Sequence, residues 1–129
     1  KALEHNNSGT LYSIDSIFRP WQSENMIGSI IPENLKKNWN LVIGSSDKIL
    51  QNLFDSVDKT DIFIHDSLHT YKNMMFEFEC ALNNIKNGII LSDDILDNDA
   101  FYDFTIKNNV KNNIIQVEDK VGFGIIEKI

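Results

Sequence analysis

The sequence predicts an α/β fold with a mostly parallel sheet. Short apolar runs alternate along the chain with longer segments that have helical spacing, and the runs contain few polar residues. Strands of that composition are covered on both faces, as in a parallel sheet that lies between helices. The 129 residues are enough for one domain, and 42% apolar and 24% charged residues are typical of a globular protein.

Four apolar runs are predicted to be the parallel strands. Each leads into turn-forming or acidic residues at its carboxyl end, which is where a strand gives way to a loop. The runs are residues 11–14, 41–43, 62–64 and 89–91, and the residues that follow them are Asp15, Gly44-Ser45-Ser46, His65-Asp66-Ser67 and Ser92-Asp93-Asp94.

The segments between the strands have the spacing of amphipathic helices. One apolar stripe consists of Met74, Phe78, Ala81, Leu82 and Ile85, and Asn87-Gly88 is predicted to end this helix. Residues 47–54 and 99–107 show similar spacing. Residues 1–4 resemble the end of a helix, and residues 24–31 are predicted to be helical, with Pro32 starting a second short turn.

The last two apolar runs are predicted to form an antiparallel hairpin at the sheet edge. They span residues 114–117 and 123–126, and only the turn-rich residues 119–122 join them. Because no helix separates the runs, a parallel crossover has no room to form.

Charge and composition exclude several classes of protein. Twelve Lys and Arg against 19 Asp and Glu give a net charge of −7, which argues against the phosphate backbone of a nucleic acid as the main partner. No apolar run approaches the roughly 20 residues that span a bilayer, so no membrane partner is expected. The single cysteine, Cys80, cannot form an internal disulfide, and a reducing, cytoplasmic location is expected.

Polar residues at the strand ends are the candidate ligand-binding residues, because open α/β sheets bind ligands beyond the carboxyl ends of their strands. Asp66, Asp93 and Asp94 follow two strands that should be neighbours. Carboxylates held close together repel one another unless a cation lies among them, and oxygen ligands suit Mg²⁺. The alternative is that Asp94 caps a turn while Asp93 faces solvent.

His69 follows Asp66 by three residues and could face the same cleft. An imidazole there could accept a proton from a substrate hydroxyl, since its pKa lies near working pH. The alternative is a histidine on the surface or at a helix start. Neither GxGxxG nor GxxxxGK[ST] occurs in the chain, so the sequence gives little support to a nucleotide-phosphate site.

Taken in order, these residues resemble the class I S-adenosylmethionine-dependent methyltransferases. The resemblance rests on residues 11–15, 42–46, 61–71 and 82–94, and above all on a strand followed by Asp66-x-x-His69-x-Tyr71. The most similar branch contains the metal-dependent sugar O-methyltransferases of macrolide biosynthesis. The resemblance spans about residues 9–126 and implies one partial, Rossmann-like methyltransferase domain over residues 1–129.

The resemblance also implies roles for the matching residues. Asp15 would bind the two ribose hydroxyls of S-adenosylmethionine, and Ser46 and Asp47 would lie near its adenine ring. Asp66 would lie beside the cofactor as well as ligate Mg²⁺ together with Asp93 and Asp94, and His69 would be the base. The methyl acceptor would be a hydroxylated small molecule or a sugar.

The sequence departs from the family pattern at several points. Ser45 stands where the family usually has an acid, and Asp93 stands where it often has Glu. The family's first strand and its glycine-rich cofactor loop would precede residue 1, so an N-terminally truncated sheet with weak cofactor binding is expected. Such a sheet would leave apolar edges at residues 11–14 and 62–64, which a second copy of the chain could cover as a homo-oligomer.

Two other functions remain open at this point. One is a non-catalytic Rossmann-like remnant that acts through self-association. The other is a metal-dependent hydroxylase or hydrolase, which would need a further histidine ligand. His5 and His65 do not obviously supply it, because His65 ends a strand and is predicted to point away from Asp66.

Overall fold

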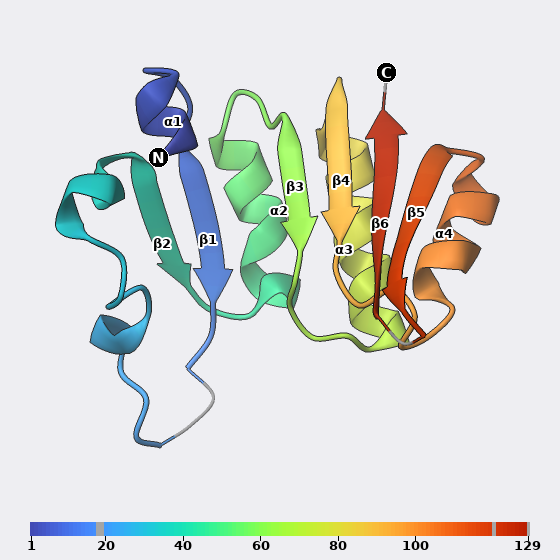
Figure 1. Ribbon diagram of the computed structural model, residues 1–129, viewed down its shortest axis with the longest axis horizontal. Coiled ribbons are helices and arrows are strands. Elements are labelled where there is room, and N and C mark those ends of the chain that lie inside the picture. The colour runs from blue at the N-terminus through green and yellow to red at the C-terminus, as the bar shows by residue number, and fades with distance from the viewer. Residues whose placement is uncertain (18–19, 120, 129) are drawn as a thin grey trace. The chain divides into compact units, whose positions relative to one another are not determined.

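Helices and strands alternate along the chain in the computed structural model, which describes residues 1–17, 20–119 and 121–128 (Figure 1). The contacts group these residues into two units, Lys1–Ile49 and Leu50–Ile129. The mixed α/β class, the parallel strand pairs and the C-terminal antiparallel hairpin are all as the sequence predicts.

The first unit is built on a two-stranded parallel sheet. Strand β1 (Leu11–Asp15) pairs in register with β2 (Trp39–Ile43), so that Asp15 lies opposite Ile43. Strand β2 begins two residues before the predicted run, because Trp39 and Asn40 continue the pairing. The indole Nε1 of Trp39 also donates a hydrogen bond to Ser13 Oγ at 3.0 Å.

Short helical turns fill the rest of this unit. Helix α1 (Ala2–His5) is the helix end that residues 1–4 predict. The helix predicted over residues 24–31 is wrong in extent, because only the 3-10 turn η1 (Glu24–Met26) forms there. Pro32 precedes a second 3-10 turn, η2 (Glu33–Asn38), as predicted.

The second unit is built on a four-stranded sheet in the order β3-β4-β6-β5. Strand β3 (Ile62–His65) runs parallel to β4 (Gly88–Ser92), and β4 runs antiparallel to β6 (Val121–Lys128). Strand β5 (Lys111–Glu118) pairs antiparallel with β6 and forms the edge. Because β6 already begins at Val121, the link is shorter than predicted, and its Lys120 lies outside the described residues.

The core of the second unit lies between this sheet and its helices. Helix α2 (Ser46–Ser56) belongs to this unit from Leu50 onwards. Helix α3 (Tyr71–Asn84) joins β3 to β4, and α4 (Ala100–Asn108) follows β4. The rings of Phe78 and Phe104 lie 5.3 Å apart, and both side chains are fully buried. The other fully buried apolar side chains include Met74, Ile85, Ile90 and Ile126.

Gly88 does not end helix α3, and this prediction is wrong. The helix stops at Asn84, and Ile85 is already extended, with φ −76° and ψ 125°. Gly88 instead begins β4, where a Cβ atom would collide with the main-chain oxygen of Asp61. A glycine is therefore required there for the close approach of two chain segments.

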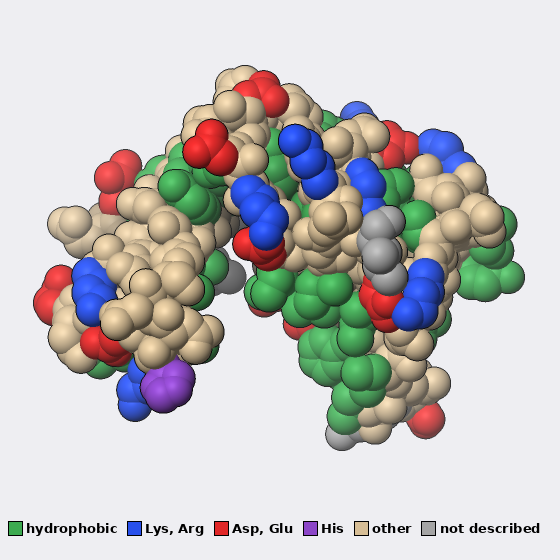
Figure 2. Space-filling model, turned by 90° about the horizontal axis from the view of Figure 1, so that it is seen from above, with side chains coloured by type: hydrophobic (Ala, Val, Ile, Leu, Met, Phe, Trp, Pro, Cys, Tyr) green, Lys and Arg blue, Asp and Glu red, His purple; other side chains and the backbone are tan. Residues whose placement is uncertain are grey.

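The prediction that both faces of the strands are covered is wrong for β3. Its alternate residues Ile62 and Ile64 are 56% and 60% exposed, whereas His65 is fully buried. The neighbouring hairpin also leaves Ile115 and Phe123 exposed, and these two residues are partners across β5 and β6. Figure 2 shows hydrophobic side chains, drawn in green, standing at the surface.

No helix among the described residues has the length and apolar character that crossing a bilayer requires.

Candidate functional site

The carboxyl ends of β1 and β2 bring three of the predicted residues to one edge. Asp15 is the last residue of β1, and its main-chain oxygen accepts a hydrogen bond from Gly44 N at 2.8 Å. Ser46 begins α2 directly after β2, and Asp47 lies in the first turn of that helix. The structure thus places Asp15, Ser46 and Asp47 at the same edge of this sheet.

This edge offers both hydrogen-bond acceptors and donors. The carboxylate of Asp15 is half-buried, and its Oδ1 accepts a hydrogen bond from Ser16 N at 2.7 Å. Ser46 also carries a hydroxyl group at the start of α2, and a hydroxyl can both donate and accept a hydrogen bond. A carboxylate beside a hydroxyl group can bind a ligand that carries both hydroxyl groups and ring nitrogens.

The carboxyl ends of β3 and β4 form a second edge, in the second unit. His65 and Ser92 are partners at the end of the parallel pair, and Asp93 N donates a hydrogen bond to the main-chain oxygen of His65 at 3.0 Å. Asp66 and Asp93 therefore leave adjacent strands at the same level. Asp66 is exposed, and Asp93 and Asp94 are partly exposed.

The three aspartates do not form the predicted magnesium site in this structure. Within residues 1–17, 20–119 and 121–128, no three His, Cys, Asp or Glu side chains lie close enough together to hold a metal ion. The tight turn after β4 gives the reason. Asp94 has a left-handed backbone, with φ 45°, and its N–H donates to Asp93 Oδ1 at 2.9 Å. A turn does form here, but the alternative assigned its cap to the wrong residue, because the acceptor is the carboxylate of Asp93 and not that of Asp94.

His69 directly precedes Thr70, the N-cap of α3, so it stands at a helix start, as one of the alternatives had it. It lies in the loop between β3 and α3, and its main-chain oxygen accepts a hydrogen bond from Asn98 Nδ2 at 3.2 Å. The side chain is only partly exposed, and its Nε2 is buried without a hydrogen-bond partner among the described residues. An unsatisfied nitrogen of this kind can accept or release a proton if a substrate reaches it.

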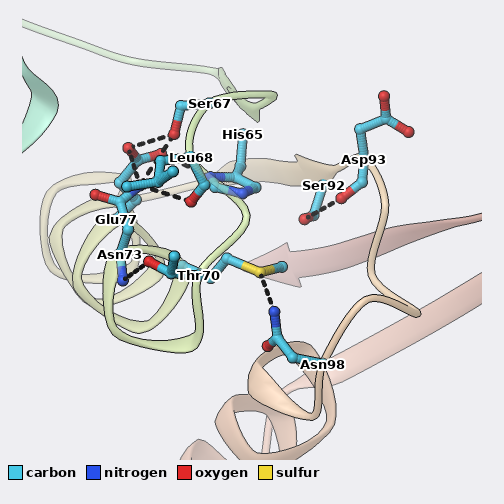
Figure 3. A network of polar contacts seen from close by, with 10 residues as sticks. His65, Ser67, Leu68, Thr70, Asn73, Glu77, Ser92, Asp93 and Asn98 are labelled. Atoms are coloured by element: carbon cyan, nitrogen blue, oxygen red, sulfur yellow. Dashed lines mark hydrogen bonds and ion pairs between the residues drawn. The ribbon is translucent and has the colours of Figure 1, made fainter.

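A buried polar network beside His69 was not predicted from the sequence. Glu77 of α3 is 2% exposed, and its Oε2 lies 2.7 Å from Nδ1 of the fully buried His65 (Figure 3). Its Oε1 accepts hydrogen bonds from Ser67 Oγ at 2.7 Å and from Asn73 Nδ2 at 2.9 Å. One signal was visible in the sequence: Glu77 is a charged residue in the stripe that contains Met74, Phe78 and Ala81.

The ring of His65 also contacts two other rings. Its centroid lies 5.0 Å from that of His69, at an interplanar angle of 77°, and 5.4 Å from that of Phe78. His65 thus faces α3 and the core, whereas Asp66 is exposed, as strand alternation predicts.

Other titratable groups near α3 have structural partners. Tyr71 donates a hydrogen bond to Asp103 of α4 at 2.9 Å, and this bond raises the pKa of the phenol. Burial, with the nearby carboxylates of Glu77 and Glu79 as further causes, raises the pKa of the Cys80 thiol. Because both pKa values are raised, Tyr71 and Cys80 stay protonated at neutral pH, and a protonated thiol is unreactive.

Two surface hollows in the described part of the chain lie away from these strand ends. One is lined by α1, η2 and the first residues of β1 and β2. The other is lined by the end of α3, the start of β5 and the end of β6. Neither contains a residue of the candidate site.

Comparisons with known proteins point in one direction. A family model described as a methyltransferase domain matches residues 1–95. The solved structure of the Podospora anserina methyltransferase PaMTH1, bound to SAH, superposes with a TM-score of 0.65 at 15% sequence identity. The match covers 93% of this chain and 61% of that one, so the chain spans about three-fifths of the length of that protein and shares its fold. No curated protein sequence matches the chain.

Proposed function

The chain belongs to the methyltransferase-domain family, and from that premise we propose that it transfers a methyl group from S-adenosylmethionine to an oxygen atom. The acceptor in this proposal is a hydroxylated small molecule or a sugar. The cofactor follows from the family and from the likeness in fold to a methyltransferase bound to SAH.

The observation that carries the proposal is the edge formed by Asp15, Ser46 and Asp47 after the parallel strands β1 and β2. A carboxylate at the end of a strand can accept hydrogen bonds from both hydroxyls of a ribose, and such charge-assisted bonds are stronger than neutral ones. Ser46 and Asp47 would lie along the adenine ring, where the Ser46 hydroxyl can donate a hydrogen bond to a ring nitrogen.

His69 is the proposed catalytic base. When bound, S-adenosylmethionine supplies a methyl group on a positively charged sulfur, which leaves as a neutral thioether. The hydroxyl oxygen of the acceptor forms the new bond to the methyl carbon, and its proton passes to the imidazole of His69. A positioned base of this kind contributes about 10²–10⁴-fold to the rate.

A divalent metal ion has no step in this proposal. Asp66, Asp93 and Asp94 do not fit such an ion in the part of the chain that the structure describes, because Asp93 is hydrogen-bonded to the backbone of Asp94 and no third ligand lies within reach.

We also propose a reducing, cytoplasmic location, since the one cysteine of the chain, Cys80, is buried as a free thiol.

Calorimetric binding of S-adenosylhomocysteine tests the proposal. Asp15→Asn should weaken binding by about tenfold or more, because the charge-assisted hydrogen bonds are worth about 1.5–3 kcal/mol. Asp58→Asn removes the same charge from an exposed residue and is the matched control. Equal affinity of the Asp15→Asn variant and the unmodified protein would contradict the assignment of the ribose to this edge.

A further inference from the structure

The two carboxylate oxygens of Glu77 face different groups, and this difference sets the orientation of the whole network. Oε1 accepts hydrogen bonds from Ser67 Oγ and from Asn73 Nδ2. The amide nitrogen of Asn73 can only donate, so the atom at the Oε1 position has to be an acceptor. Oε2 faces Nδ1 of His65 at 2.7 Å.

This contact determines which nitrogen of His65 carries hydrogen. An ionised carboxylate has no hydrogen to donate, so Nδ1 of His65 is the donor. In the neutral imidazole, Nε2 is then a bare acceptor. That acceptor is buried with the ring, which is 0% exposed, and it has no hydrogen-bond partner among the described residues. A buried acceptor without a partner costs free energy, so a donor that can reach it is favoured.

His69 is the residue that can supply this donor. Its Nε2 is the other buried side-chain atom that lacks a partner in the described part of the chain, and its ring centroid lies 5.0 Å from that of His65. An N–H···N hydrogen bond spans about 3 Å and each nitrogen lies about 1 Å from its ring centre, so two imidazoles joined in this way have about this separation. Phe78, which packs on the same ring, offers no hydrogen-bonding atom.

We infer that Glu77 and His65 are positioning residues that set the tautomer of His69. In this arrangement His69 turns about its Cβ–Cγ bond and donates Nε2–H to Nε2 of His65. Its Nδ1 then carries the lone pair and is the atom that accepts the proton of the methyl acceptor. The role of Nδ1 rests on the proposed function, whereas the tautomers rest on the Glu77 network alone.

A merely structural role for Glu77 would look different. The contact between Glu77 and His65 joins α3 to the end of β3, and its only role could be to hold these two elements together. In that case a change at Glu77 would alter stability, but it would leave the tautomer of His69 as it is.

Long-range ¹⁵N–¹H spectra of ¹⁵N-histidine-labelled protein separate the two roles. The spectra are recorded at alkaline pH, and the ¹⁵N shifts themselves show whether each ring is neutral. The chain has three histidines, and His5 of α1 serves as an internal reference. In the unmodified protein, hydrogen is expected on Nδ1 of His65 and on Nε2 of His69.

Glu77→Gln should invert both tautomers. The carbonyl of the new amide has to take the place of Oε1, because Asn73 donates there, and its NH₂ group then faces His65 Nδ1. His65 becomes an acceptor at Nδ1 and a donor at Nε2, and His69 moves its hydrogen to Nδ1. Glu79→Gln, two residues along α3 in an exposed pair with Lys107, should change neither ring.

Two results would overturn the inference. One is hydrogen on Nδ1 of His69 in the unmodified protein, which needs no variant and is decisive even if Glu77→Gln does not fold. The other is a Glu77→Gln protein in which His65 inverts but His69 does not. The tautomers are measured without cofactor or acceptor. A protein that shows the expected tautomers of His65 and His69 but transfers no methyl group would contradict the proposed function. The inference about the two tautomers would still stand.

Discussion

Glu77→Ala should destabilise the protein much more than the same change two residues away. In the native protein the Glu77 carboxylate accepts a hydrogen bond from His65, whose ring is 0% exposed, and from Ser67 and Asn73. Ser67 is exposed and Asn73 is partly exposed, so both can turn to water when the carboxylate is removed. The Nδ1 of His65, by contrast, is buried with the rest of its ring.

The cost follows from this difference in burial. A buried donor left without its partner costs about 1–3 kcal/mol, and breaking a buried charged pair costs about 3–5 kcal/mol. We therefore expect Glu77→Ala to lower the free energy of unfolding by about 2–5 kcal/mol. Glu79 pairs with Lys107 at the surface, where an ion pair is worth about 0–1 kcal/mol. Both variants place Ala in α3, so the gain in helix propensity cancels.

Urea unfolding measures the difference. With an m value of about 1.5 kcal/mol/M, the midpoint for Glu77→Ala should fall by roughly 1–3 M, and that for Glu79→Ala by well under 1 M. If the two variants unfold at the same midpoint, the Glu77 network is not buried as described and the inference drawn from it loses its basis.

Other features of the structure make further predictions. Gly124→Ala should lower the free energy of unfolding by about 1–3 kcal/mol, because the new Cβ would lie 2.7 Å from Cδ2 of the buried Phe101 and closer still to its Cε2. An unchanged melting temperature would contradict this and show that the Phe101 ring can move aside. Burial raises the pKa of the Cys80 thiol, so the folded protein keeps this proton longer than the unfolded chain, and stability should fall as pH rises from about 8.5 towards the higher folded pKa. Urea unfolding at several pH values should show this fall in the unmodified protein and a smaller one in Cys80→Ala; identical slopes would contradict it. Millimolar Mg²⁺ should leave the melting temperature unchanged, whereas a rise that Asp94→Asn abolishes would mean that the aspartates do share an ion in solution.

The fold was largely predictable because its signals are local. Apolar runs ending in turn residues located β1, β3 and β4, and the lack of a helix between the last two runs identified the hairpin. Gly88 was misassigned because glycine follows helices often, whereas its actual role depends on the approach of Asp61, a residue far away in the sequence. No local pattern reports such a contact.

The site was predictable only in part. Strand ends placed Asp15, Ser46 and Asp47 at one edge, because parallel strands end at the same level. The convergence of Asp66, Asp93 and Asp94 could not be judged from spacing, since it depends on the backbone of one residue in a turn. Glu77 was overlooked because a single acid in an apolar stripe shows neither its partner nor its burial until α3 packs on β3.

The proposed function makes its most direct claim about where S-adenosylhomocysteine binds. A crystal structure of the protein soaked with this molecule should place both ribose hydroxyls within hydrogen-bond distance of the Asp15 carboxylate, with the adenine ring beside Ser46 and Asp47. Ribose bound away from Asp15, or no bound molecule at a concentration well above the calorimetric Kd, would contradict the account.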